Sequence, residues 1–210
     1  MCKFQGGIIM QMKDVQREIL ENKRRHGFNT TNIELEICYL YGEIRESYEA
    51  YYKGLDTFGE ELADVAIFLM GIAEIKKIDL ATEVLRKTLS NHYDSLQGGI
   101  AMEMQDMETG ITVHMRDVQR EIHENEVRHG FNITNVEQKF CNLYGEVGEA
   151  YEAYYKGWDT FAEELADVAI YLMGIAEIKG IDLGAEILKK VEKNKNRQYE
   201  RNEKGYMVHL

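Results

Sequence analysis

The sequence contains one unit twice, and this duplication constrains the fold more than any other feature. The segment MKDVQREI at Met12 returns as MRDVQREI at Met115, a displacement of 115 − 12 = 103 positions. Residues 12–91 align with 115–194 without a gap, and about 56 of roughly 80 paired residues are identical. Copies this similar must share a fold. We therefore predict a first repeat over residues 1–94, a linker over 95–114 and a second repeat over 115–210.

Composition and periodicity favour long helices. The chain has no proline, although average usage of about 5% would supply about ten, and the absence of proline suits uninterrupted helices. Helical spacing of apolar residues in the second repeat predicts helices at Val113–Arg128, Val136–Tyr155, Thr160–Lys179 and Leu183–Glu203. We predict an all-α fold in which two such four-helix units pack as a pseudo-twofold pair within one chain.

Residues that commonly begin and end helices separate these segments. Asn135 and Thr160 occupy N-cap positions, and Glu163 follows Thr160 at the spacing of a capping box. Glycines stand at the ends of the first three predicted helices, namely Gly130, Gly157 and Gly180. The boundaries suggested by these residues agree with those given by the periodicity.

Charge and cysteine content exclude several classes of protein. The formal net charge is −12, which disfavours a surface for nucleic acid polymers or anionic membranes and requires local cations or metal for an anionic ligand. Three cysteines without a CxxC pair predict neither a disulfide framework nor a thiolate zinc site. We expect Cys38 and Cys141 in the core. Because no segment reads as a signal peptide or a membrane span, we expect a cytoplasmic protein.

Four carboxylates of the second repeat stand where apolar side chains are expected. Glu146 lies at the edge of the apolar arc of its helix, and Glu149 follows three residues later. On the next helix Glu164 lies inside the apolar stripe, and Asp167 follows three residues later. Acids at this spacing are often solvated, but carboxylates inside an apolar face are costly unless a cation neutralises them.

Two kinds of metal site use inward carboxylates on helices. A di-iron bundle needs a histidine three residues after a glutamate, and neither Glu146 nor Glu164 has one. A set of oxygen donors with no lysine or arginine on the same helix faces favours Mg²⁺, with Mn²⁺ as a substitute.

Together with its flanking segments, this pattern resembles the all-α nucleoside triphosphate pyrophosphohydrolases, the MazG-like superfamily. The resemblance rests on GEVGE at Gly145–Glu149, EELAD at Glu163–Asp167, EIHENEVRHGF at Glu121–Phe131 and GIDLGAEILKKVEKNKNR at Gly180–Arg197. These motifs occur in the order typical of that superfamily and cover nearly all of each copy.

The resemblance implies a Mg²⁺-dependent hydrolase that converts a nucleoside triphosphate into a monophosphate and pyrophosphate, and it suggests a role in clearing unwanted nucleotides. In that superfamily the acids equivalent to Glu146, Glu149, Glu164 and Asp167 hold Mg²⁺, and a metal-activated water attacks the α-phosphorus. We assign the role of catalytic base to Glu149.

Basic residues near the end of the second repeat are candidates for phosphate binding. Lys190, Asn194 and Arg197 share a helix face and match the phosphate-binding tail of the superfamily. A basic helix end that complements the helix dipole is the alternative. Lys156 and Trp158 are further candidates for substrate contacts, with a solvated lysine and a packing aromatic residue as the alternatives.

The first repeat keeps the four acids, as Glu43, Glu46, Glu61 and Asp64. Its surroundings differ, because Arg45 replaces Gly148 and Asp94 stands at the position of Arg197. An acid in place of a phosphate-binding arginine weakens triphosphate affinity. We therefore predict one competent site, in the second repeat, and a weaker site in the first.

A non-catalytic helical scaffold or nucleotide-sensing module with a degenerate MazG-like fold is the alternative function. It is suggested by Gly145, where many members of the superfamily have another glutamate, and by Arg45 within the first acidic motif. We expect a homodimer with four repeats. The preference for base and sugar stays open.

Overall fold

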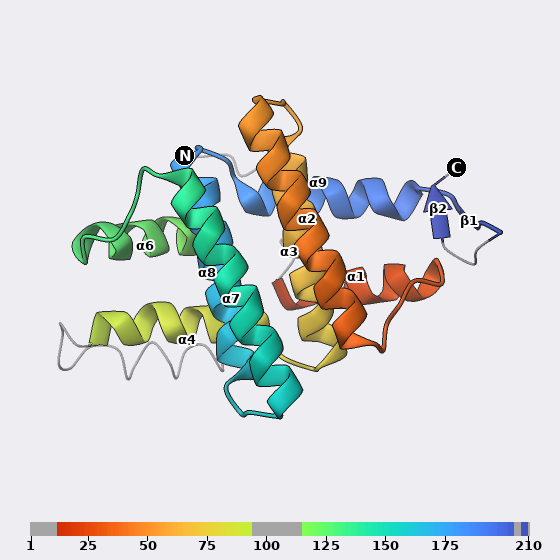
Figure 1. Cartoon of the computed structure of the whole chain (residues 1–210), viewed down its shortest axis with the longest axis horizontal. Helices are drawn as coiled ribbons and strands as arrows, with labels where there is room; N and C mark the ends of the chain where they lie inside the picture. Colours follow the sequence, from red (N-terminus) through yellow and green to blue (C-terminus); the bar gives the residue numbers. More distant parts are fainter. Residues whose placement is uncertain (1–11, 94–114, 204–206, 210) are drawn as a thin grey trace, which may run out of the picture.

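The computed structural model describes residues 12–93, 115–203 and 207–209 (Figure 1). The predicted linker at 95–114 and the start of the first repeat at 1–11 lie outside the described residues. The first repeat forms α1 (Met12–Arg25), α2 (Ile33–Lys53), α3 (Phe58–Ile75) and α4 (Leu80–Tyr93). The second forms α6 (Met115–Arg128), α7 (Val136–Lys156), α8 (Phe161–Ile178) and α9 (Leu183–Asn196). The predicted all-α class is confirmed for this helical body.

The last predicted helix is too long. It ends at Asn196, because Arg197 adopts an extended backbone with φ −71° and ψ 145°. The chain continues as β1 (Tyr199–Arg201), which pairs antiparallel with β2 (Met207–His209). This hairpin is the exception to the helical fold within the described ranges, and it lies at the end of α9 (Figure 1).

The caps are confirmed in part. The Asn135 side chain accepts a hydrogen bond from the Gln138 backbone N–H at 2.9 Å. Thr160 makes no side-chain cap hydrogen bond, because its own backbone is already helical, so the predicted capping box is wrong. The three predicted terminal glycines all have φ between +67° and +70°, a conformation that glycine adopts without strain.

The fourth helix of each repeat packs against the other repeat. α4 lies against α8 and α6, whereas α9 lies against α3 and α1. In Figure 1, α4 runs beside α6 on one side of the molecule, and α9 runs above α1 on the other. This arrangement corrects the expectation of two units of four consecutive helices, since each half takes its fourth helix from the other repeat.

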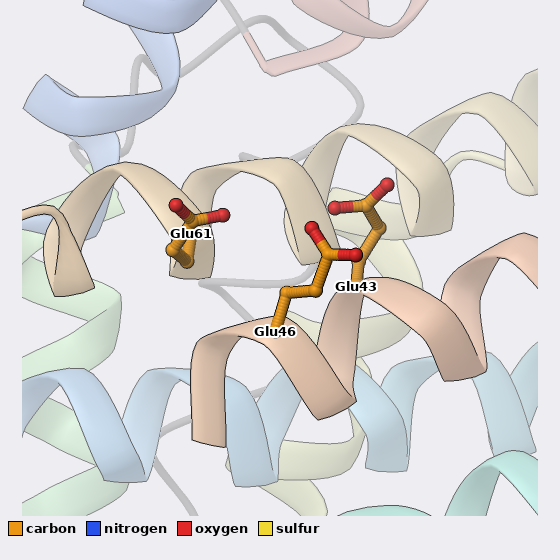
Figure 2. A group of neighbouring side chains, drawn as sticks. All are labelled: Glu43, Glu46 and Glu61. Carbon is orange, nitrogen blue, oxygen red and sulfur yellow. The ribbon is translucent and has the colours of Figure 1, made fainter. Parts of the chain in front are cut away.

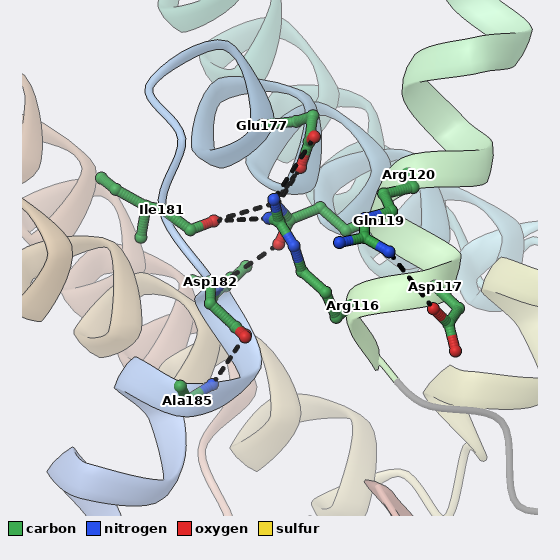
Figure 3. A network of polar contacts seen from close by, with 9 residues as sticks. Arg116, Asp117, Gln119, Arg120, Glu177, Ile181, Asp182 and Ala185 are labelled. Carbon is green, nitrogen blue, oxygen red and sulfur yellow. Dashed lines mark hydrogen bonds and ion pairs between the residues drawn. The ribbon is translucent and has the colours of Figure 1, made fainter. Parts of the chain in front are cut away.

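Buried glutamines fix the point from which the exchanged helices start. Gln119 is fully buried, and its Nε2 donates to Glu177 at 2.6 Å and to the Ile181 carbonyl at 2.8 Å. Its Oε1 accepts from the Leu183 backbone N–H at 3.3 Å. Figure 3 shows the Gln119 side chain with Glu177 and Ile181. Gln16 makes the same contacts with the turn before α4. Each exchanged helix is therefore anchored at its first residue by the first helix of its own repeat.

The centre of the core comes from α3 and α8, which pack against each other. Their most deeply buried large side chains are Leu62, Leu69, Ile72, Leu165, Leu172 and Ile175. α2 packs against α7, where the rings of Tyr41 and Tyr144 stack with 6.1 Å between their centroids. No helix in the described parts of the chain is long and apolar enough to cross a membrane.

The prediction that Cys38 and Cys141 belong to the core is wrong, since both thiols are exposed. The buried arc of α2 is carried by Ile37, Leu40 and Ile44, and residue 38 lies about 100° or more from each of them around the helix.

The turn before α4 contains a strained residue that the second repeat avoids. Lys77 has φ +60°, and the equivalent Gly180 has φ +67°. A left-handed conformation costs a side-chain-bearing residue about 1–2 kcal/mol, partly offset by the entropy that glycine loses on folding.

We expect Lys77→Gly to stabilise the protein by up to about 1 kcal/mol. Urea unfolding would measure the change, and Gly180→Ala is the matched control, expected to destabilise. A lower midpoint for Lys77→Gly would contradict this account.

Candidate metal and phosphate site

Carboxylates of the first repeat converge between α2 and α3. Glu43 and Glu46 extend from α2 and Glu61 extends from α3 (Figure 2). One oxygen from each of the three lies within 4.8 Å of the others. Asp64 stands one turn after Glu61 on α3. We call these four acids, together with Lys190, Asn194 and Arg197, site 1. Hard oxygen donors at this separation are the donor set that Mg²⁺ prefers.

The protein does not fully compensate the charge of these acids. Burial, reinforced by the neighbouring Asp64, Glu46 and Glu61, raises the pKa of Glu43 to about 7. Burial also raises the pKa of Glu61, and that of Asp64 despite its contact with Lys190. Repulsion among partly buried carboxylates is what a bound cation relieves, so the electrostatics and the donor chemistry both fit a divalent metal.

The lysines that pair with the α3 acids at site 1 come from the second repeat. Lys190 Nζ lies 2.5 Å from Asp64 Oδ2 and 2.7 Å from Glu60 Oε1. Lys193 Nζ lies 2.5 Å from the same Glu60 oxygen. Hydrogen bonds from these two lysines lower the pKa of Glu60 to about 2. The prediction that this basic tail serves the acids of its own repeat is therefore wrong, because α9 packs against α3 instead of α8.

A cavity of about 610 Å³ adjoins the carboxylates. Glu43, Glu46 and Asp64 line it together with Asn194 and Arg197. Its aromatic lining residues are Phe28, Tyr39, Phe68 and Tyr199. The oxygens Asn22 Oδ1 and Asn194 Oδ1 are buried without a hydrogen-bond partner. We call this cavity 1. It combines acids, cations, aromatic rings and unpartnered amides, as a site for a charged ligand with a ring would.

The second repeat forms a related but different arrangement, which we call site 2. Oxygens of Glu146, Glu164 and Asp167 lie within 4.8 Å of one another, and burial followed by the charge of Asp167 raises the pKa of Glu146 to about 7. Lys87 of α4 forms an ion pair with Asp167. The proposed base Glu149 is exposed and is not part of this group. The residue equivalent to Arg197 is Asp94, which lies outside the described residues.

The other predicted contacts are placed elsewhere. Lys156 pairs with Glu152 and lies 4.5 Å above the Trp158 ring, and neither Lys156 nor Trp158 lines the cavity of either site. Arg45 bonds to Glu46 Oε1 at 3.1 Å and to Glu49 at 2.8 Å, with its side chain 61% exposed. Arg45 therefore engages one oxygen of the acid cluster from the solvent side and leaves the cluster open.

A buried ion pair beside each site went unnoticed in the sequence. Lys23 pairs with Glu36 in the first repeat, and Glu126 pairs with Lys139 at the equivalent positions in the second. The two charges have changed places. Burial lowers the pKa of Lys23 despite the partner carboxylate. The reciprocal reversal at two aligned positions is a signal in the sequence that would have predicted this contact.

Comparison of the chain with models of known protein families, with curated protein sequences and with solved structures found no match. The resemblance to the MazG-like superfamily therefore stays a prediction, and a function has to be inferred from the residues of the site.

The reversed pair supplies a test of the buried charges. Lys23→Glu places two carboxylates together at a buried position, so we expect a loss of about 3–5 kcal/mol in unfolding free energy. The double variant Lys23→Glu/Glu36→Lys reproduces the order found in the second repeat and should recover most of that loss. Recovery stays incomplete because Asn29 Nδ2 donates to Glu36 Oε1 at 2.9 Å and loses its acceptor. Purely additive effects in the double-mutant cycle would refute the pairing.

The raised pKa values predict how stability changes with pH. Glu43 and Glu146 have folded-state pKa values of about 7 against 4.5 for the free side chain. The folded state therefore favours their protonated forms, and their contribution to stability falls as pH rises from 4.5 through 7. In EDTA, Tm should fall by a few degrees over this interval.

Magnesium should suppress that fall, because it favours the ionised carboxylates in the folded state. Glu43→Gln and Glu146→Gln should each flatten the dependence in EDTA, whereas Glu34→Gln, an exposed acid on α2, should not. A Tm in EDTA that rises across the same interval would contradict the assignment.

Proposed function

We propose that the chain is a Mg²⁺-dependent nucleoside triphosphate pyrophosphohydrolase of the MazG-like kind, with its working site at site 1. The observation that carries this proposal is the meeting of partly buried carboxylates on α2 and α3 with Lys190 and Arg197 at the end of the exchanged helix. A polyphosphate ligand needs both, because metal and fixed cations together balance its charge.

The residues that would hold the metal are Glu43, Glu46 and Glu61, with Asp64 adjoining them. Bound Mg²⁺ withdraws charge from phosphate oxygens and lowers the pKa of water. Glu46 Oε1 accepts from Arg45, so we assign the acceptance of a proton to Oε2. In that role Glu46 would leave the metal to Glu43, Glu61 and Asp64. Glu46 occupies the position that Glu149 occupies in site 2.

The remaining residues orient the ligand. The Arg197 guanidinium presents a planar pair of N–H donors suited to phosphate, and Lys190 is fixed by Asp64 and Glu60 beside the acids. The aromatic lining of cavity 1 offers ring faces for a base. In this proposal the two repeats act as an intramolecular dimer of MazG-like units, and a single chain supplies every residue of site 1.

The test is pyrophosphate release from a panel of canonical and damaged nucleoside triphosphates, with Mg²⁺ or with EDTA. Glu61→Gln should lower the rate by about 100-fold or more, because it removes a charge from the metal-binding set. Glu164→Gln is the matched variant in site 2, and it should keep most of the activity. The opposite ranking of the two variants would move the working site to the second repeat, as the sequence alone predicts.

Arg197→Ala tests the exchange of helices. We expect a loss of about 10–100-fold in kcat/KM, the value of a charge-assisted hydrogen bond. The loss should be non-additive with Glu61→Gln, although the two residues belong to different repeats. A folded protein that releases no pyrophosphate from any nucleotide with Mg²⁺ or Mn²⁺ would favour the non-catalytic, nucleotide-sensing alternative.

A further inference from the structure

A second cavity, of about 270 Å³, adjoins site 2 and has a different character from cavity 1. We call it cavity 2. Apart from Lys87, its lining residues occupy positions equivalent to those of cavity 1, displaced by 103, so the two cavities can be compared residue by residue. The apolar or aromatic residues Leu35, Tyr39, Phe68 and Val191 of cavity 1 become Gln138, Asn142, Tyr171 and Thr88 in cavity 2. Gln138, Tyr171 and Thr88 each add a hydrogen-bonding group that cavity 1 lacks at that position, and Asn142 replaces the ring of Tyr39 with an amide.

Two residues that line cavity 2 each have a buried side-chain oxygen without a hydrogen-bond partner. Glu126 is 7% exposed, and its Oε1 pairs with Lys139 while its Oε2 has no hydrogen bond. Thr88 is 4% exposed, and its Oγ1 also has no hydrogen bond. A buried carboxylate oxygen without a donor costs the folded protein free energy, so a ligand that donates to it gains an interaction prepared in advance.

Cavity 1 lacks an equivalent free oxygen on its buried carboxylate. Glu36 accepts from Lys23 with Oε2 and from Asn29 with Oε1. The reversal of the ion pair has moved the carboxylate from α2 to α6. Asn29 Nδ2 donates both to Glu36 and to the Asn32 carbonyl, whereas Asn132 Nδ2 keeps the equivalent bond to the Asn135 carbonyl and leaves Glu126 Oε2 without a donor. The free acceptor is thus a product of the divergence between the repeats.

The charges around cavity 2 disfavour a triphosphate. Among the described residues that line it there is no arginine, and its two lysines are paired, Lys87 with Asp167 and Lys139 with Glu126. Phe131 and Tyr171 supply ring faces, and Gln138 and Asn142 supply amides at the lining. A planar, uncharged heterocycle fits these groups better than an anion does.

We propose that cavity 2 is a separate binding site for an unphosphorylated heterocycle that carries an amino group, such as an aminated nucleobase or its nucleoside, with the amino N–H donated to Glu126 Oε2. This inference uses residues of cavity 2 alone and does not require hydrolysis at site 1. Thr88 Oγ1 is the second contact, and as a hydroxyl it can donate to a ring nitrogen or accept from an amino group.

The experiment is titration of the full chain in EDTA with matched nucleosides, followed by calorimetry. Adenosine and cytidine carry the amino group, whereas purine riboside and pyrimidin-2-one riboside lack it and introduce no new N–H donor. We expect the amino-bearing member of each pair to bind about 10–100-fold more tightly, because only it satisfies the carboxylate oxygen. Leaving out metal and triphosphate separates this measurement from any failure of the hydrolase proposal.

Two variants assign the binding to cavity 2. Thr88→Val introduces the residue that cavity 1 has at Val191, with little change in volume, and should weaken binding without unfolding the protein. Glu126→Gln should remove the preference for the amino group, while Glu36→Gln disturbs the equivalent ion pair in cavity 1 and should leave that preference intact. Equal binding of both members of a pair, no binding at millimolar concentration, or a preference that survives Glu126→Gln would overturn the proposal.

Discussion

The carboxylates that meet between α2 and α3, and between α7 and α8, repel one another. Other parts of the structure supply cations that partly balance this negative charge. Packed helices bring these acids together, and burial opposes their ionisation, as the raised pKa values of Glu43 and Glu146 show. Each cluster meets a lysine from the other repeat, Lys190 at Asp64 and Lys87 at Asp167. One lysine neutralises only part of the charge of four acids, so a further cation would reduce the repulsion that remains.

The exchange of the fourth helices is what delivers those lysines. Gln16 and Gln119 hold the turns from which α4 and α9 depart, so the direction of each exchanged helix is fixed inside its own repeat. The helix then crosses to the other repeat and covers α8 or α3. The same route places Arg197 beside the acids of the first repeat, which makes the two sites unequal although their acids are the same.

Much of this could be predicted from the sequence, and the failures have a common physical origin. The helices and the acidic motifs follow from local periodicity, because burial of one helix face leaves its mark on every turn. The partner of a helix leaves no such mark. The apolar face of α9 would suit α3 or α8 equally, since the two are nearly identical in sequence. Lys190, Asn194 and Arg197 were therefore recognised as candidates but assigned to the wrong acids, and the hairpin after Asn196 was missed for lack of a proline or glycine stop signal.

The exchanged helices also separate this chain from an ordinary symmetric assembly. In a homodimer every substitution appears at both sites at once, so the two sites must stay alike. Here the copies are joined in one chain, and each site draws its acids from one copy and its basic helix from the other. A substitution therefore changes one site and spares its counterpart, as the ion pair of Lys23 with Glu36 and its reversed counterpart of Lys139 with Glu126 illustrate. Removal of either repeat would also remove the basic helix of the other repeat's site. The duplication therefore allows the two sites to diverge in chemistry, but each copy still needs the other to complete its site.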